Sequence, residues 1–378
     1  MAKLKKISIL LYLWLLFIFG CSSIYAVDVN SVADELDMNS LINTLKEYTN
    51  DEINIEGMAQ DLITGKGIDY GVVGDFALDK LFYEVRFSLK TAVSVLIVII
   101  IMAIIKGIEL EKDSTVSKVT SLVGFLVIVT MLLNSYFTIV KVFTDTVGLI
   151  TGVMEIVSPF MLAILIATGE ITTSGIIGPV LLFVTSLIGV VISYIILPLL
   201  TASLVFKIIS NMSDEIKVDK LSKIFSSTAM WTIGIIFTLF LGIMELEGSV
   251  TTSIDEVAVK TTQVAVSNLV PVIGKFVSDS LDVVMGASEI IGKSVGIIGI
   301  VIIILGCLIP IIKIILCSFG CFVLSAFSEL LNTDSKITDL CGAISKQYKT
   351  LLGIMVGVIV TFVIAIGVII NLMGKVAS

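Results

Sequence analysis

Apolar runs long enough to cross a membrane recur along this sequence from residue 91 to residue 373. A crossing helix needs about 20 apolar residues. The runs that meet or approach this length are 91–108, 119–140, 176–205, 224–244 and 351–373. The chain is 57% hydrophobic and 15% charged, whereas soluble domains carry about 25% charged residues. The sequence therefore predicts an all-α, polytopic integral membrane protein.

The first 26 residues have the three parts of a secretory signal peptide. A basic start with Lys3, Lys5 and Lys6 precedes an apolar run over 7–19, and small and polar residues follow up to Ala26. Cleavage after Ala26 is the favoured interpretation, and a lipoprotein-type cleavage at Cys21 or an uncleaved anchor are the alternatives. The chain after this signal is then expected to begin on the outer side of the membrane.

The charge pattern divides the rest of the chain. Lysines cluster between the first two runs and again over 207–223, which marks cytoplasmic loops by the positive-inside rule. We expect six to eight transmembrane helices. The expected segments are a signal peptide (1–26), an acidic extracytoplasmic segment (27–88), an N-terminal transmembrane region (89–244), an amphipathic extracytoplasmic or re-entrant region (245–294) and a C-terminal transmembrane region (295–378).

Two stretches leave the span count open. Residues 142–168 contain Asp145, Glu155 and Pro159 and read as a packed span, a re-entrant segment or an interfacial helix. If the lysine-rich loops before and after this stretch are both cytoplasmic, strict alternation of crossings requires that residues 142–168 do not cross the membrane fully. A non-crossing or broken helix is therefore favoured there. The apolar runs 295–312 and 314–327, separated by Lys313, read as a tight hairpin or as one long kinked passage.

Two amphipathic helices are predicted from helical periodicity. The first covers 262–285, is bent or interrupted near Pro271, and carries Lys275, Asp279 and Asp282 opposite its apolar stripe. The second covers 335–349, and its apolar positions are Ile337, Leu340, Cys341, Ile344 and Tyr348.

Three ionisable residues fall inside or beside apolar runs: Asp145, Glu155 and Lys313. Such groups are costly in a membrane and often functional. The alternatives are that each marks the end of a span, with its charge reaching the interface, or that it pairs with another protein group. All three are retained as candidate intramembrane polar residues.

The composition argues against an enzyme and against any cofactor. Histidine is absent, which removes the commonest general base and metal ligand. The five cysteines form no CxxC pair, so a zinc or dithiol site is not expected. No phosphate-binding glycine motif is visible, and no basic patch supports binding to nucleic acid.

One block of the sequence resembles a known family. The block comprises Leu246–Ser253, Lys260–Thr261, Ser267–Gly274, Asp279, Asp282, Lys293–Gly296, Pro310 and Lys313. Its order, after a signal peptide, an acidic segment and apolar spans, is similar to the stage III sporulation protein AE family. That resemblance implies a mother-cell membrane protein, located during engulfment in the membrane around the forespore.

The resemblance also implies partners and a role. Members work with other membrane proteins of the stage III sporulation A operon and with a forespore-side partner, in a transenvelope channel complex or feeding tube related to protein export. No catalytic residue carries over. As a hypothesis, the partner-docking or pore-proximal residues are Pro271, Gly274, Lys275, Asp279, Asp282 and Lys293. The alternative function is a secondary transporter or permease with a midplane site at helices broken near Pro159, Pro271 and Pro310.

Overall fold

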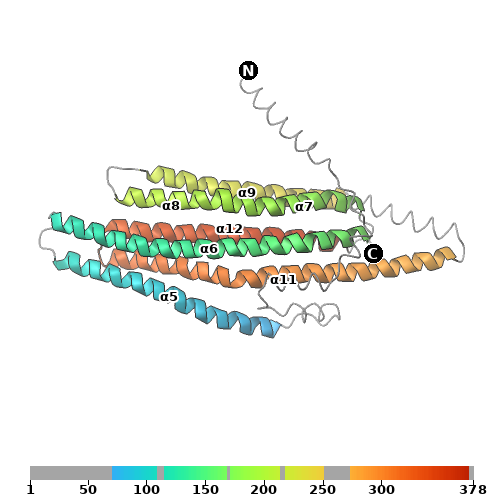
Figure 1. The fold of residues 1–378 in the computed structure, drawn as a ribbon, viewed down its shortest axis with the longest axis horizontal. Helices are drawn as coiled ribbons and strands as arrows, with labels where there is room; N and C mark the ends of the chain where they lie inside the picture. The colour runs from blue at the N-terminus through green and yellow to red at the C-terminus, as the bar shows by residue number, and fades with distance from the viewer. Residues whose placement is uncertain (1–69, 109–114, 168–170, 213–217, 251–272, 374–378) are drawn as a thin grey trace, which may run out of the picture. The chain divides into compact units, whose positions relative to one another are not determined.

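The structure, a computed structural model, describes residues 70–108, 115–167, 171–212, 218–250 and 273–373 (Figure 1). Within these ranges the chain is helical apart from short turns, and no strand occurs. The elements are α5 (Tyr70–Ile108), α6 (Thr115–Ala167), α7 (Ile171–Val191), the π-helical turn η1 (Ile192–Ile196), α8 (Leu197–Met212), α9 (Asp219–Val250), α11 (Ile273–Leu330) and α12 (Ser335–Met373). The predicted all-α class is confirmed, while the predicted signal peptide lies outside the described residues.

Six helical stretches in the described part of the chain are long and apolar enough to cross a membrane. The number agrees with the lower end of the expected range. The stretches are Ser88–Lys106, Ser121–Ala167, Ser174–Met212, Asp219–Ile243, Gly292–Leu330 and Ser335–Met373. The π-helical turn η1 is part of one continuous passage from α7 into α8.

Both stretches that the sequence left open are continuations of neighbouring helices. Residues 142–168 lie largely in the second half of α6, which runs through Pro159 without the expected break. Residues 295–327 lie within α11, which runs through Pro310 and forms no hairpin. The charges within these runs had looked like helix boundaries. A charged side chain leaves its own backbone N–H and carbonyl free to make the helical hydrogen bonds, so both helices continue.

Four of the six stretches are longer than a bilayer requires. At about 1.5 Å per residue, the 19-residue stretch in α5 spans about 29 Å, which is close to the hydrocarbon thickness of about 30 Å. The 47-residue stretch in α6 spans about 70 Å by the same rule. The long helices must therefore tilt strongly or continue beyond the hydrocarbon layer in contact with other protein.

Helix α12 lies at the centre of the packing. It contacts α6, α8, α9 and α11, and its contact with α11 is the most extensive in the bundle (Figure 1). Its buried residues recur every three or four positions from Ile337 to Met373, the spacing of one helix face. The five apolar positions predicted for 335–349 are all fully buried, which confirms that amphipathic face.

The turn between α11 and α12 shows how the sequence ends one helix and starts the next. Asn332 has a φ of 50°, the left-handed conformation that asparagine tolerates at a helix C-terminus. The Thr333 N–H donates to the Ser328 carbonyl at 3.1 Å and the Asn332 N–H to the Glu329 carbonyl at 3.0 Å, which is the Schellman pattern. Asp334 then caps α12 by accepting from the Lys336 N–H at 3.1 Å.

The predicted GxxxG face of α12 is used at one glycine only. A Cβ at Gly357 would collide with the ring of Phe237 on α9, whereas a Cβ at Gly353 would meet nothing within 4 Å. The close approach of α9 to α12 therefore depends on Gly357.

We predict that Gly357→Leu destabilises the protein by about 1–3 kcal/mol, the usual cost of overpacking. Gly353→Leu is the matched control, because it places the same side chain in open space on the same helix. Unfolding of the purified protein by titration with dodecyl sulfate would measure both. Equal destabilisation by the two substitutions would contradict the proposed packing.

Candidate functional site

Polar contacts gather at one end of the bundle, which we call the lysine end. Lys106 Nζ donates to the Asn332 carbonyl at 2.7 Å, Ser121 Oγ donates to Asp334 at 2.8 Å, and Asn211 Nδ2 donates to the Lys336 carbonyl at 3.3 Å. These bonds tie α5, α6 and α8 to the turn between α11 and α12. The helix ends that the sequence flanks with lysines thus meet in one place.

A group of ion pairs at the lysine end joins α8 and α9. Lys207 Nζ lies 2.7 Å from one Asp219 oxygen, and Lys223 Nζ lies 2.9 Å from the other. Lys207 lies on α8 and Asp219 is the first residue of α9, so the ion pair links the two helices. The negative charge of Asp219 also stabilises the N-terminus of α9 by its interaction with the helix dipole.

A neutral polar cluster is buried between α8, α9 and α12. Gln347 Nε2 donates to Ser203 Oγ at 3.2 Å, and Ser203 Oγ donates to the Ser222 carbonyl at 2.7 Å. All three side chains are less than 9% exposed. The sequence reasoning missed this cluster because serine and glutamine inside an amphipathic pattern give no signal for a partner far along the chain.

Two aromatic rings pack beside this cluster in the core. The rings of Tyr136 and Tyr348 stack with centroids 6.1 Å apart, and the Tyr348 hydroxyl donates to Ser135 Oγ at 3.2 Å. Both rings are fully buried. They fix α6 against α12 at one level of the bundle.

The predicted partner-docking residues lie at the start of α11 or before it. Pro271 is outside the described residues. Gly274, Lys275, Asp279 and Asp282 lie on the backbone of α11, but their side chains are outside the described part. Lys293, one of the same set, is half-buried at the point where the membrane-length stretch of α11 begins. The described part of the predicted amphipathic helix, residues 273–285, is therefore continuous with a membrane helix rather than a separate element.

The candidate intramembrane residues do not come together in a site. Asp145 and Glu155 are both exposed on α6, whereas Lys313 is half-buried on α11. Lys141, which directly follows the predicted apolar run 119–140, is also exposed on α6, one helical turn before Asp145. Its spacing from Asp145 and Glu155 was the signal that would have placed all three on one helix face.

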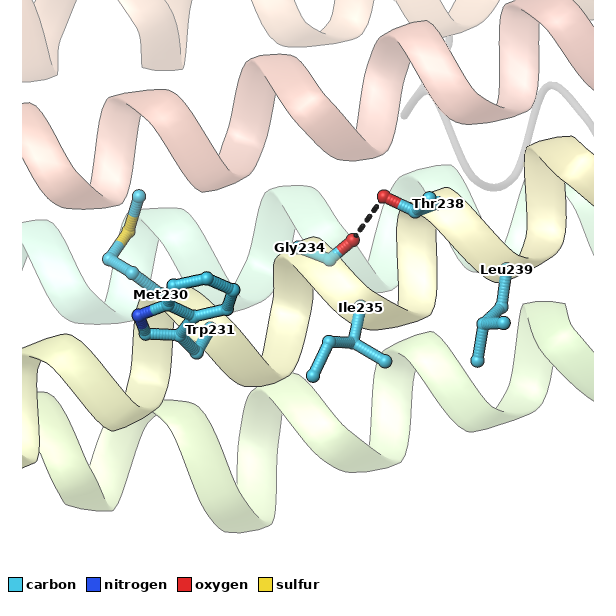
Figure 2. A pocket seen from close by; sticks show the side chains of 6 residues that line it. All are labelled: Met230, Trp231, Gly234, Ile235, Thr238 and Leu239. Atoms are coloured by element: carbon cyan, nitrogen blue, oxygen red, sulfur yellow. Dashed lines mark hydrogen bonds between the residues drawn. The ribbon is translucent and has the colours of Figure 1, made fainter.

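A surface hollow among the described residues lies on α9 and carries no charged group. It encloses about 580 Å³ and is lined by Met230, Trp231, Gly234, Ile235, Thr238 and Leu239. Figure 2 shows that all six come from this one helix, with the Thr238 hydroxyl donating to the Gly234 carbonyl at 2.8 Å. Such a lining offers apolar contact but no acid, base or nucleophile.

In the part of the chain that the structure describes, no group of three or more His, Cys, Asp or Glu side chains is arranged so that it could hold a metal ion. The polar groups that do meet are hydroxyls, amides and lysine–carboxylate pairs between helices. Their arrangement can hold helices together. The fold and these contacts define a polytopic helical membrane protein with a polar, lysine-rich end.

Comparison with known proteins identifies the family. The chain belongs to the stage III sporulation protein AE family, whose family model matches residues 53–373. A protein named stage III sporulation protein AE from Bacillus subtilis (strain 168) is 28% identical over 292 residues, covering 77% of this chain and 73% of that relative. No solved structure matches the chain. The family membership implies a role in sporulation.

We predict that Ser203→Ala lowers the free energy of unfolding by about 1–3 kcal/mol, because it leaves the buried Gln347 amide without its acceptor. The double variant Ser203→Ala/Gln347→Leu should recover most of that loss, since both polar partners are then removed. Dodecyl sulfate titration of the single and double variants gives the comparison. Additive losses in the double variant would show that the two side chains do not act together.

Proposed function

We propose that this protein is a membrane-embedded structural or channel component of the complex that links mother cell and forespore during endospore development. In this proposal it resides in the mother-cell membrane around the forespore. It would work there with other membrane proteins of its operon and with a forespore-side partner. Family membership supports a role in sporulation. The continuity of α11 supports assembly with partner proteins.

The observation that carries the proposal is the continuity of α11. The helix begins at Ile273, within the block where the family resemblance is most specific, and continues to Leu330 through the membrane-length stretch that starts at Gly292. A partner bound to residues 273–291 would be coupled rigidly to a transmembrane helix. That arrangement suits a component that joins an extracytoplasmic assembly to the membrane.

The direction of the chain supports the same proposal. The turns after α5, α8 and α11 lie at the lysine end, so the start of α5, the end of α9 and the start of α11 lie at the opposite end (Figure 1). By the positive-inside rule the lysine end faces the cytoplasm. Segments 27–88 and 245–294 would then project toward the forespore membrane.

This topology predicts a labelling pattern in sporulating cells. Single cysteines at positions 60 and 275, in a chain whose native cysteines are replaced, should react with a membrane-impermeant maleimide added from outside. Cysteines at positions 115 and 215 should react only after the membrane is opened, because the start of α6 at Thr115 and the end of α8 at Met212 lie at the lysine end. Labelling of 215 with protection of 275 would reverse the topology and remove the docking role.

The docking role makes a separate prediction. The triple variant Lys275→Ala/Asp279→Ala/Asp282→Ala should insert into the membrane normally but recover at least about tenfold less of the partner proteins, because the charged face of the amphipathic helix supplies the polar contacts. Co-purification from sporulating cells and counts of heat-resistant spores would measure the effect.

A matched control is available at the lysine end. Lys220, Glu329 and Asp339 are exposed there, and replacing them with alanine removes the same numbers of positive and negative charges. This control should retain partner recovery and sporulation. If the α11 triple variant behaves like the control, the docking role is wrong.

A further inference from the structure

The second half of α6 presents an outer face unlike any lipid-facing surface. Between residues 138 and 159, no exposed position of α6 carries a large apolar side chain. The exposed residues, which we call the polar face, are Thr138, Lys141, Asp145, Gly148, Glu155 and Pro159. Their spacing of three, four or seven residues places them on one side of the helix.

The first half of the same helix shows the contrast. Its exposed residues include Leu122, Val123, Leu126, Val127 and Phe137, with 41–55% of each side chain exposed. This is the composition expected for contact with acyl chains. The change to a polar face therefore occurs within one continuous helix and within one apolar stretch.

Neighbouring helices at the same level keep an apolar outer surface. The Ser135–Tyr348 hydrogen bond and the close approach of Gly299 to Val157 and Ile366 align α12 with this part of α6. The outward residues of α12 over that length include Val356, Val360 and Ile364. The outer surface is thus polar on α6 while it remains lipid-compatible on α12.

Helix α7 gives the same comparison from the other side. A Cβ at Gly189 would lie 3.5 Å from Thr151 and one at Gly178 would lie 3.1 Å from Leu162, which aligns α7 with the polar face. Between those glycines α7 exposes Leu182 and Phe183. Charged groups facing acyl chains are costly, so we infer that the polar face contacts protein rather than lipid.

We propose that the polar face binds a second copy of this chain, with α6 packed side by side against α6 of its neighbour. The face carries opposite charges one helical turn apart, and the structure gives neither Lys141 nor Asp145 an ion-pair partner among the described residues. Copies inserted in the same direction place the two residues about 6 Å apart in height. A lysine side chain can span that height, so Lys141 of each copy can form an ion pair with Asp145 of the other.

Gly148 permits the close approach that this pairing needs. It is exposed, and a Cβ there would meet nothing within 4 Å, so none of the residues that the structure describes occupies the space above it. Small residues on a membrane helix let two backbones pack closely. Farther along, Glu155 of the two copies has the same sign, so the helices must diverge there around water. The inference uses only α6 and does not depend on the proposed function.

The test is disulfide crosslinking of the full-length chain in native membranes. With the native cysteines replaced, Gly148→Cys should form a covalent dimer on mild oxidation, and mass spectrometry should find only this chain in it. Gly353→Cys on α12 is the matched control, because Gly353 is also exposed with open space for a Cβ, and it should form no dimer. If replacing the cysteines prevents folding, a benzophenone amino acid at position 148 in the otherwise unaltered chain replaces this readout.

Charge reversal tests the pairing itself. Lys141→Asp or Asp145→Lys alone should lower crosslinking at position 148 at least about tenfold, because like charges then face each other. The double exchange Lys141→Asp/Asp145→Lys should restore it. The proposal is overturned by equal dimer at 148 and 353, by no dimer at 148, by a crosslink there to another protein or to another segment of the same chain, or by a double exchange that stays uncrosslinked.

Discussion

Most of this backbone lies where water cannot solvate it, so each peptide group must find its hydrogen-bond partner inside its own helix. That constraint explains why helices run on past residues that would end them in a soluble protein. Proline removes one N–H and crowds the preceding turn, yet α6, α7 and α11 continue through Pro159, Pro179 and Pro310. In the passage from α7 to α8 the wider π-turn η1 comes just before Pro198, where the usual helical donor is missing.

Side-chain hydroxyls obey the same constraint. Threonines along the apolar helices donate to the carbonyl four residues earlier, which satisfies the hydroxyl without a partner from another helix. The threonines that do so in the described part of the chain are Thr130, Thr138, Thr144, Thr146, Thr151, Thr185, Thr232, Thr238, Thr350 and Thr361. A threonine in a span is therefore weak evidence for a site, whereas an unpaired lysine or carboxylate on the same surface is stronger evidence.

The sequence predicted the helical class, the membrane-length stretches and the buried face of 335–349, because each depends on local periodicity and composition. It did not predict that residues 119–140 and 142–168 share one helix. Asp145 and Glu155 had looked like boundaries, and only the three-dimensional packing shows that they lie on an outer face. The sequence did not predict the cluster of Ser203, Ser222 and Gln347 for a different reason. Its members are up to 144 residues apart, and neutral polar residues carry no pattern that identifies such distant partners.

The distribution of charge bears on whether a solute would pass through one chain or between chains. A carrier site at the membrane midplane needs interrupted helices whose freed backbone groups face a central cavity. In this structure α6 and α11 are uninterrupted at Pro159 and Pro310, and the buried cluster around Gln347 is neutral. Lys141 and Asp145, which have no ion-pair partner among the described residues, instead lie on the outer face of α6. A polar path that used them would be formed where copies meet, as an assembled channel would require and a single-chain carrier would not.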